Sequence, residues 1–106
     1  YFTNHYSPDA DSAESKAFVA AYQKEYNAKP DAPAVLGYDG AKLMFDAITR
    51  AGAVDGAKVS AALASTKGFK AVTGETSLNA THDAVKSAVI IQFKDGKQTY
   101  RATVKP

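Results

Sequence analysis

The feature that most constrains the fold is a short apolar stretch near the carboxyl end, residues 88–93, followed by Asp95-Gly96. The stretch is β-branched and nearly apolar on both alternating faces, which is typical of a strand covered on both sides. Asp-Gly favours a two-residue hairpin turn, because both positions of such a turn need positive φ. We therefore expect a strand over residues 88–93, a tight turn, and a return strand over residues 98–104.

The first two-thirds of the sequence carries helical patterns instead. Asp11-Ser12-Ala13-Glu14 resembles a capping box and predicts a helix over residues 12–26. A second helix is predicted over residues 36–51, with Asp39 near its positive amino-terminal end. Asp55 can cap a third helix that ends near residue 63. The apolar face expected on the second helix consists of Leu36, Leu43, Met44, Ala47 and Ile48.

The predicted strands are too few to cover three amphipathic helices. Besides the hairpin, only residues 72–78 and the opening Tyr1-Phe2-Thr3 have a strand-like pattern, and Tyr1-Phe2-Thr3 resembles the end of a strand. Helices packed on a sheet define an α/β arrangement, and such helices bury their apolar stripes on sheet strands. We therefore expect residues 1–106 to be a single carboxyl-terminal fragment of a larger α/β protein.

Composition and charge exclude several functions. The 13 basic and 11 acidic residues leave a net charge of +2, which gives no electrostatic reason to expect nucleic acid or an anionic membrane as partner. The absence of cysteine excludes thiolate metal sites and cysteine nucleophiles. The two histidines, His5 and His82, are far apart, so no metal site and no cofactor is predicted. His82-Asp83 is a hypothetical hydrolase dyad, but a solvated turn is the favoured interpretation.

The tyrosines divide into two groups. Tyr22 and Tyr26 lie on the apolar face of the first predicted helix and are expected in the core. Tyr6 in a loop and Tyr38 at a helix start are candidates for facing a cleft, because binding residues concentrate in loops.

Several segments resemble, in order, the carboxyl-terminal part of the leucine/isoleucine/valine-binding proteins, type I periplasmic receptors of branched-chain amino acid ABC importers. The resemblance covers nearly the whole chain, and each segment is short, so it rests on their order and spacing. The segments are residues 17–26, 29–32, 37–41, 51–52, 63–69, 72–74 and 85–89.

The resemblance implies a two-lobed receptor that closes on its ligand by hinge motion, outside the cytoplasm and without enzymatic activity. By resemblance, residues 1–87 would belong to the amino-terminal lobe with one hinge strand. Residues 88–106 would form another hinge strand and a hairpin of the carboxyl-terminal lobe. The implied partners are a small-molecule ligand (an amino acid or related carboxylate), the permease subunits and the missing amino-terminal part of the protein.

The family's main ligand-binding residues lie in earlier segments, so few are expected here. The resemblance points to the loop before the second helix, Pro33-Ala34, where the family often has an aromatic residue that touches the ligand. Pro33 followed by the small Ala34 would leave room for a bulkier or aromatic ligand. Tyr6, near the hinge, is the other candidate.

Three alternatives stay open at this point. The same fold could serve as the ligand-sensing domain of a regulator or chemoreceptor, or His82-Asp83 could belong to a small hydrolase. The chain could also be an interaction module, whose uncovered sheet edges favour self-association.

Overall fold

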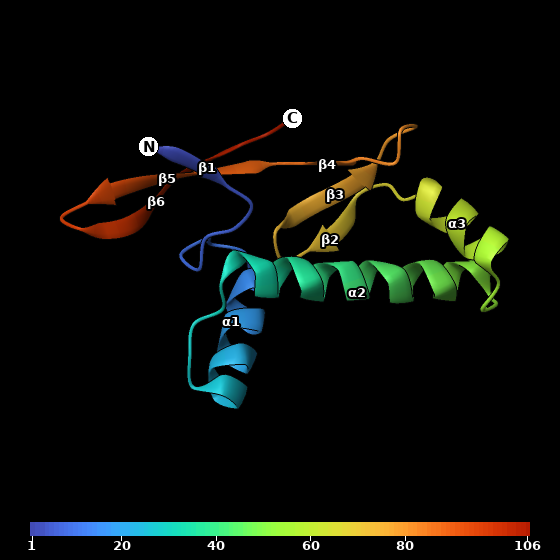
Figure 1. Cartoon of the computed structure of the whole chain (residues 1–106), viewed down its shortest axis with the longest axis horizontal. Coiled ribbons are helices and arrows are strands. Elements are labelled where there is room, and N and C mark those ends of the chain that lie inside the picture. Colours follow the sequence, from blue (N-terminus) through green and yellow to red (C-terminus); the bar gives the residue numbers. More distant parts are fainter.

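The computed structural model describes all residues, 1–106, and contains three helices and two small sheets (Figure 1). The molecule is elongated, with extents of 50 × 32 × 19 Å. The helices are α1 (Ala13–Tyr26), α2 (Ala32–Ala51) and α3 (Gly56–Ala64). The strands are β1 (Phe2–Asn4), β2 (Phe69–Ala71), β3 (Gly74–Leu78), β4 (Ala84–Lys86), β5 (Ala88–Lys94) and β6 (Lys97–Val104).

The first sheet joins the two ends of the chain in the order β1-β5-β6, with both pairs antiparallel. Strand β1 pairs with β5 so that Phe2 lies opposite Ile91. The hairpin between β5 and β6 turns at Asp95 and Gly96, which both have positive φ, 51° and 75°. The predicted strand, turn and return strand are therefore confirmed. A bulge between Ile90 and Ile91 shifts the register within the hairpin.

The second sheet has the order β2-β3-β4, again antiparallel. The sequence predicted one strand region over residues 72–78, whereas the structure has β3 over part of it and a tight turn at Val72 and Thr73. Strands β2 and β4 were not predicted, because each has three residues and neither shows a run of alternating apolar positions. Figure 1 shows this sheet alongside α2, with α3 beyond one end of α2.

Side-chain caps define where the helices begin. Asp55 accepts from Lys58 N at the start of α3, as predicted. At the start of α1 the cap is Ser12, which accepts from Ser15 N, one residue after the Asp11 that opens the predicted capping box. Helix α2 begins at Ala32, four residues earlier than predicted, because Asp31 caps it and Pro33 fits its first turn. Asp39 is therefore inside the helix and does not occupy its positive end.

The core is small. Only 15 of 106 residues are buried, and Tyr6, Val35 and Val72 form its main apolar cluster. Of the predicted apolar face of α2, Ala47 is buried, but Leu36 and Met44 are 38% and 42% exposed. The buried residues of α2 are Val35, Asp39 and Ala47, and the half-buried Leu43 lies on the same face of the helix. None of the helices is both long and apolar enough to span a bilayer.

Candidate functional site

The residues predicted to face a ligand lie at the start of α2. Pro33 and Ala34 occupy the first helical turn and not a loop, with Pro33 exposed and Ala34 half-buried. Ala34 donates its backbone N–H to the Asp31 carboxylate at 2.9 Å. Tyr6 lies behind this turn, 3% exposed, in the cluster that contains Val35. Burial raises the pKa of Tyr6, and the neighbouring Ser15 hydroxyl in α1 partly opposes that shift.

Asp39 joins α2 to the turn between β2 and β3. Its two carboxylate oxygens accept the backbone N–H groups of Val72 at 2.8 Å and Thr73 at 2.9 Å. All three residues are buried, so the two bonds are shielded from water. This bidentate contact fixes the second sheet against the middle of α2 and thereby orients the helix whose first turn carries Pro33 and Ala34.

Lys86 extends this contact toward the first sheet. Its ammonium group donates to Thr73 Oγ1 at 2.6 Å, and burial lowers the pKa of Lys86 while the Asp39 carboxylate partly opposes that shift. Lys86 is the last residue of β4, and Ser87 alone separates it from β5. A shallow cavity of about 290 Å³ opens here, between the end of β1 and the β4–β5 junction.

Two connecting segments link the first sheet to the rest of the molecule. One runs from Asn4 into the loop before α1, and the other is Ser87 between β4 and β5. The strongest packing between elements stays within each sheet, between α2 and α3, and between α2 and β2. The first sheet packs more weakly against the remainder than these pairs of elements pack together.

A larger groove of about 610 Å³ lies between α1, α2 and β2. Four aromatic rings follow one another along it, from Tyr38 to Phe18 at 4.6 Å, to Tyr22 at 5.8 Å, and to Tyr26 at 4.6 Å between centroids. Tyr26 is 64% exposed, so its predicted place in the core is wrong. Tyr38 is 43% exposed and lines the groove, which fits its prediction as a cleft residue. The charged residues of the groove are Glu14, Glu25, Asp39, Lys42 and Lys70.

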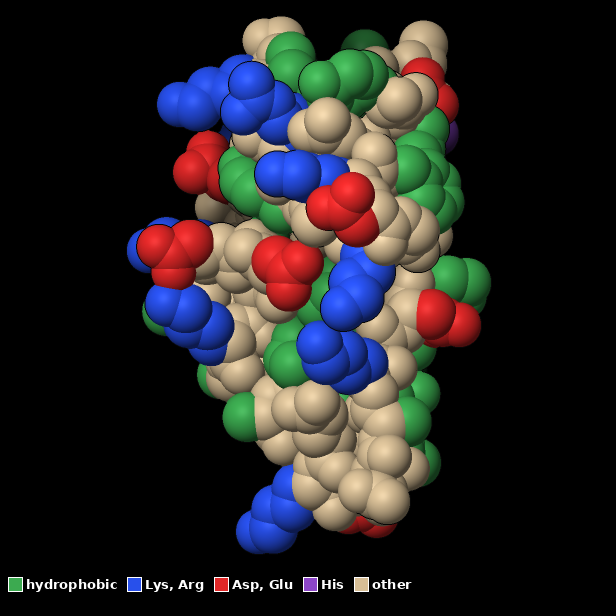
Figure 2. Space-filling view, turned by 90° about the vertical axis from the view of Figure 1, so that its left-hand side faces the viewer, with side chains coloured by type: hydrophobic (Ala, Val, Ile, Leu, Met, Phe, Trp, Pro, Cys, Tyr) green, Lys and Arg blue, Asp and Glu red, His purple; other side chains and the backbone are tan.

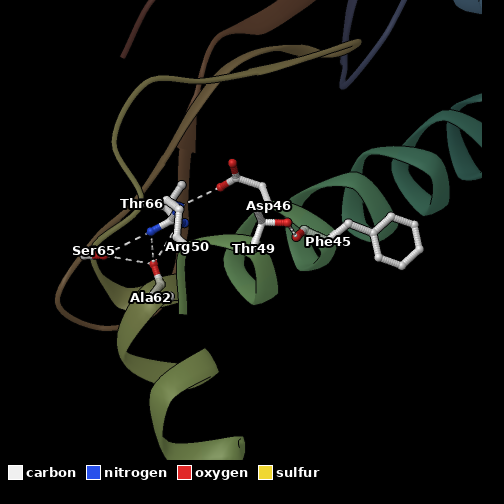
Figure 3. Close-up of polar contacts among 7 residues, drawn as sticks. All are labelled: Phe45, Asp46, Thr49, Arg50, Ala62, Ser65 and Thr66. Carbon is white, nitrogen blue, oxygen red and sulfur yellow. Dashed lines mark hydrogen bonds and ion pairs between the residues drawn. The ribbon is translucent and has the colours of Figure 1, made fainter. Parts of the chain in front are cut away.

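Arg50 connects α2 to the end of α3 (Figure 3). Its guanidinium donates to the Ala62 carbonyl at 2.7 Å, to Ser65 Oγ at 3.2 Å and to Thr66 Oγ1 at 2.9 Å. Its Nε donates to Asp46 at 2.8 Å. Arg50 therefore supplies donors to the carboxyl end of a neighbouring helix.

The remaining polar candidates form no catalytic arrangement. His82 lies in a turn with φ of 66°, and the neighbouring Asp83 carboxylate accepts from Thr81 Oγ1 at 2.7 Å. The structure places the Asp83 carboxylate on that hydroxyl, and no group of three or more histidine, aspartate or glutamate side chains converges anywhere. Figure 2 shows acidic and basic side chains interleaved with hydrophobic ones on one face of the molecule, in keeping with the near-neutral net charge.

Residues 1–98 match the family described as periplasmic binding protein. The chain therefore belongs to the periplasmic binding protein family, as its resemblance predicted. No curated protein sequence matches the chain closely.

Solved structures share its fold. The leucine-binding protein LivK from Thermotoga maritima is 35% identical over 99% of this chain, with a TM-score of 0.86. The branched-chain amino acid transporter substrate-binding protein LivJ from Streptococcus pneumoniae, solved with isoleucine, is 38% identical over 99% of the chain, also with a TM-score of 0.86. An ABC transporter solute-binding protein from Rhodopseudomonas palustris, solved with 3,4-dihydroxybenzoic acid, is 32% identical over 97%, with a TM-score of 0.82. This chain spans 30% of the length of each of these proteins.

Proposed function

We propose that this chain is part of an extracytoplasmic solute-binding receptor of an ABC importer, which binds a small carboxylate and catalyses no reaction. The observation that carries the proposal is the family match over residues 1–98. It is joined to a fold in which two connecting segments, after Asn4 and at Ser87, link the first sheet to the rest of the molecule. The similar proteins bind isoleucine in one case and 3,4-dihydroxybenzoic acid in another. The proposed ligand is accordingly an amino acid or an aromatic carboxylate, and the proposed partners are the permease subunits of the importer and the earlier part of the receptor.

The proposed boundary between lobes falls at the β4–β5 junction. Residues 1–87 would belong to the amino-terminal lobe with the hinge strand β1, and residues 88–106 to the hinge strand and hairpin of the other lobe. The division between the two sheets at Ser87 supports this boundary. Rotation of one lobe on the other would then close the cleft on the ligand.

Within this chain, the proposed ligand contacts are Pro33 and Ala34, with Tyr6 behind them. Their place in the first turn of α2, with Pro33 exposed and Ala34 half-buried, supports the proposal. Tyr6 packs with Val35 of that turn.

The test is a thermal-shift screen of the longer receptor that contains this chain, with L-leucine, L-isoleucine, benzoate and 3,4-dihydroxybenzoate as probes. A true ligand at about 100 times its Kd stabilises the receptor by about 2.7 kcal/mol. Ala34→Trp should abolish that stabilisation by filling the cleft, while Ala57→Trp, at an exposed position of α3, should leave it unchanged. Stabilisation by none of the probes or their chemical relatives would contradict the proposed function.

A further inference from the structure

A set of three polar side chains lies beside the segment that joins the two sheets. It consists of Asp39 in α2, Thr73 in the turn between β2 and β3, and Lys86 at the end of β4, and is called the brace below. The Asp39 carboxylate accepts the backbone N–H of Thr73 at 2.9 Å, and the Lys86 ammonium group donates to the Thr73 hydroxyl at 2.6 Å. Thr73 therefore connects a helix to the strand end that leads into the first sheet.

Lys86 is the last residue of the second sheet before the chain enters the first one. It pairs with Thr76 of β3, and Ser87 alone separates it from β5. The other connection starts at Asn4, which pairs with Val89 of β5, so the two connections lie side by side. Figure 1 shows β4 continuing into β5 along nearly one line. A contact that anchors Lys86 therefore restrains the direction in which β5 leaves the second sheet.

The other end of the brace lies in the helix that carries the proposed ligand contacts. Pro33 and Ala34 occupy the first turn of α2, and Asp39 lies less than about two turns further along the same helix. We propose that Lys86 is a positioning residue for ligand binding, which holds the first sheet at the angle from which the two lobes close on the ligand. This inference rests on the proposed receptor function and assigns the setting of the lobe angle to one side chain.

Burial and charge favour one fixed position of the Lys86 side chain. The side chain is half-buried, burial lowers its pKa, and Asp39 supplies the opposite charge that acts on it. Thr73 is buried, so water has little access to its hydroxyl and does not readily replace the ammonium group. Methionine in place of Lys86 keeps a long apolar side chain and removes the donor, so Lys86→Met releases the brace and leaves the packing largely intact.

Ligand affinity of the longer receptor that contains this chain tests the proposal. The probe is whichever of L-leucine, L-isoleucine, benzoate or 3,4-dihydroxybenzoate stabilises the wild type. Isothermal titration calorimetry should show at least about fivefold weaker binding for Lys86→Met. Lys86→Arg keeps a donor and should recover most of the affinity, and the control Lys94→Met, at an exposed position of β5, should leave it unchanged.

The outcomes separate this inference from the function on which it rests. Wild-type affinity in Lys86→Met would overturn the role of Lys86 and leave the receptor function standing. A wild type that binds none of the probes or their chemical relatives would contradict the receptor function, and the inference with it.

A double-mutant cycle with Thr73→Val distinguishes the brace from a general loss of stability. Valine has nearly the shape of threonine but lacks the hydroxyl that accepts from Lys86. If the two side chains act through their hydrogen bond, the double variant should bind about as weakly as Lys86→Met alone. Losses that multiply would show that the two residues act independently and would overturn the proposal. Should Lys86→Met fail to fold, Thr73→Val alone carries the same prediction of weaker binding.

Electron paramagnetic resonance measures the lobe angle itself. Spin labels at Lys58→Cys in α3 and Gln98→Cys in β6 lie on either side of Ser87, at exposed positions of a chain without cysteine. Any cysteine elsewhere in the receptor is first replaced by serine. Without ligand, Lys86→Met should broaden the distribution of distances between the labels, and Lys86→Arg should restore it. Identical distributions in the wild type and Lys86→Met would overturn the proposal.

Discussion

Replacement of Asp39 by asparagine tests the contact that orients α2. The Asp39 carboxylate accepts two buried backbone N–H groups, at 2.8 and 2.9 Å, and has Lys86 nearby. An asparagine side chain has one oxygen, so one of the two N–H groups would face an amide N–H₂ and lose its partner. A hydrogen bond to a charged group contributes about 1.5–3 kcal/mol, and an orphaned buried donor adds a cost of its own.

We therefore expect Asp39→Asn to lower the free energy of unfolding by about 2–3 kcal/mol, from a total of about 5–15 kcal/mol for a domain of this size. The corresponding fall in Tm is about 10–20 °C. Urea unfolding followed by circular dichroism at low chain concentration measures the difference. The matched control is Asp46→Asn, whose partly exposed ion pair with Arg50 should cost less than about 1 kcal/mol. Equal losses in the two variants would refute the assignment of Asp39 as the main polar contact of α2.

The remaining predictions concern the Arg50 contacts, the hairpin turn and the buried lysine. Arg50→Ala removes donors from three acceptors at the end of α3 and should destabilise the chain by about 1–2 kcal/mol. The control Arg101→Ala, at an exposed position, should cause no measurable change. The midpoint of urea unfolding measures both. Gly96→Ala places a Cβ at φ of 75° and should cost about 1 kcal/mol, and an unchanged midpoint would show that the turn adopts another conformation. Burial holds the pKa of Lys86 below its ordinary 10.5, so the unfolded chain binds more protons between the lowered pKa and 10.5. The free energy of unfolding should therefore rise with pH through that window in the wild type, relative to Lys86→Met, and parallel curves would contradict the assigned burial.

Locally encoded features of the fold could be predicted from the sequence. The Asp95-Gly96 turn and the cap at Asp55 depend on residues within four positions of each other, and the structure confirms them. The start of α1 was predicted to within one residue, with Ser12 as its cap. The start of α2 was placed wrongly because Pro33 was interpreted as a residue that precedes a helix. Proline is equally suited to the first helical turn, where its missing N–H has no partner to lose, and the Asp31 cap was the signal that could have decided between the two.

The site depended on contacts between distant segments, which spacing alone does not specify. Asp39 meets partners 33 and 34 positions away, so nothing in its neighbourhood predicted two buried N–H groups. Phe18, Tyr22 and Tyr26 recur every four residues, a spacing that serves a buried face and a groove wall equally well. Only the position of α1 relative to α2 decides that Tyr26 is exposed.

Small-angle X-ray scattering of the longer receptor, with and without its ligand, tests the central claim most directly. The claim is that the sheet of β1, β5 and β6 moves against the remainder about the segments at Asn4 and Ser87 when the cleft closes. The probe is whichever of L-leucine, L-isoleucine, benzoate or 3,4-dihydroxybenzoate stabilises the receptor. We predict a smaller radius of gyration at saturation, and an unchanged scattering curve under saturating ligand would contradict the movement of the sheet.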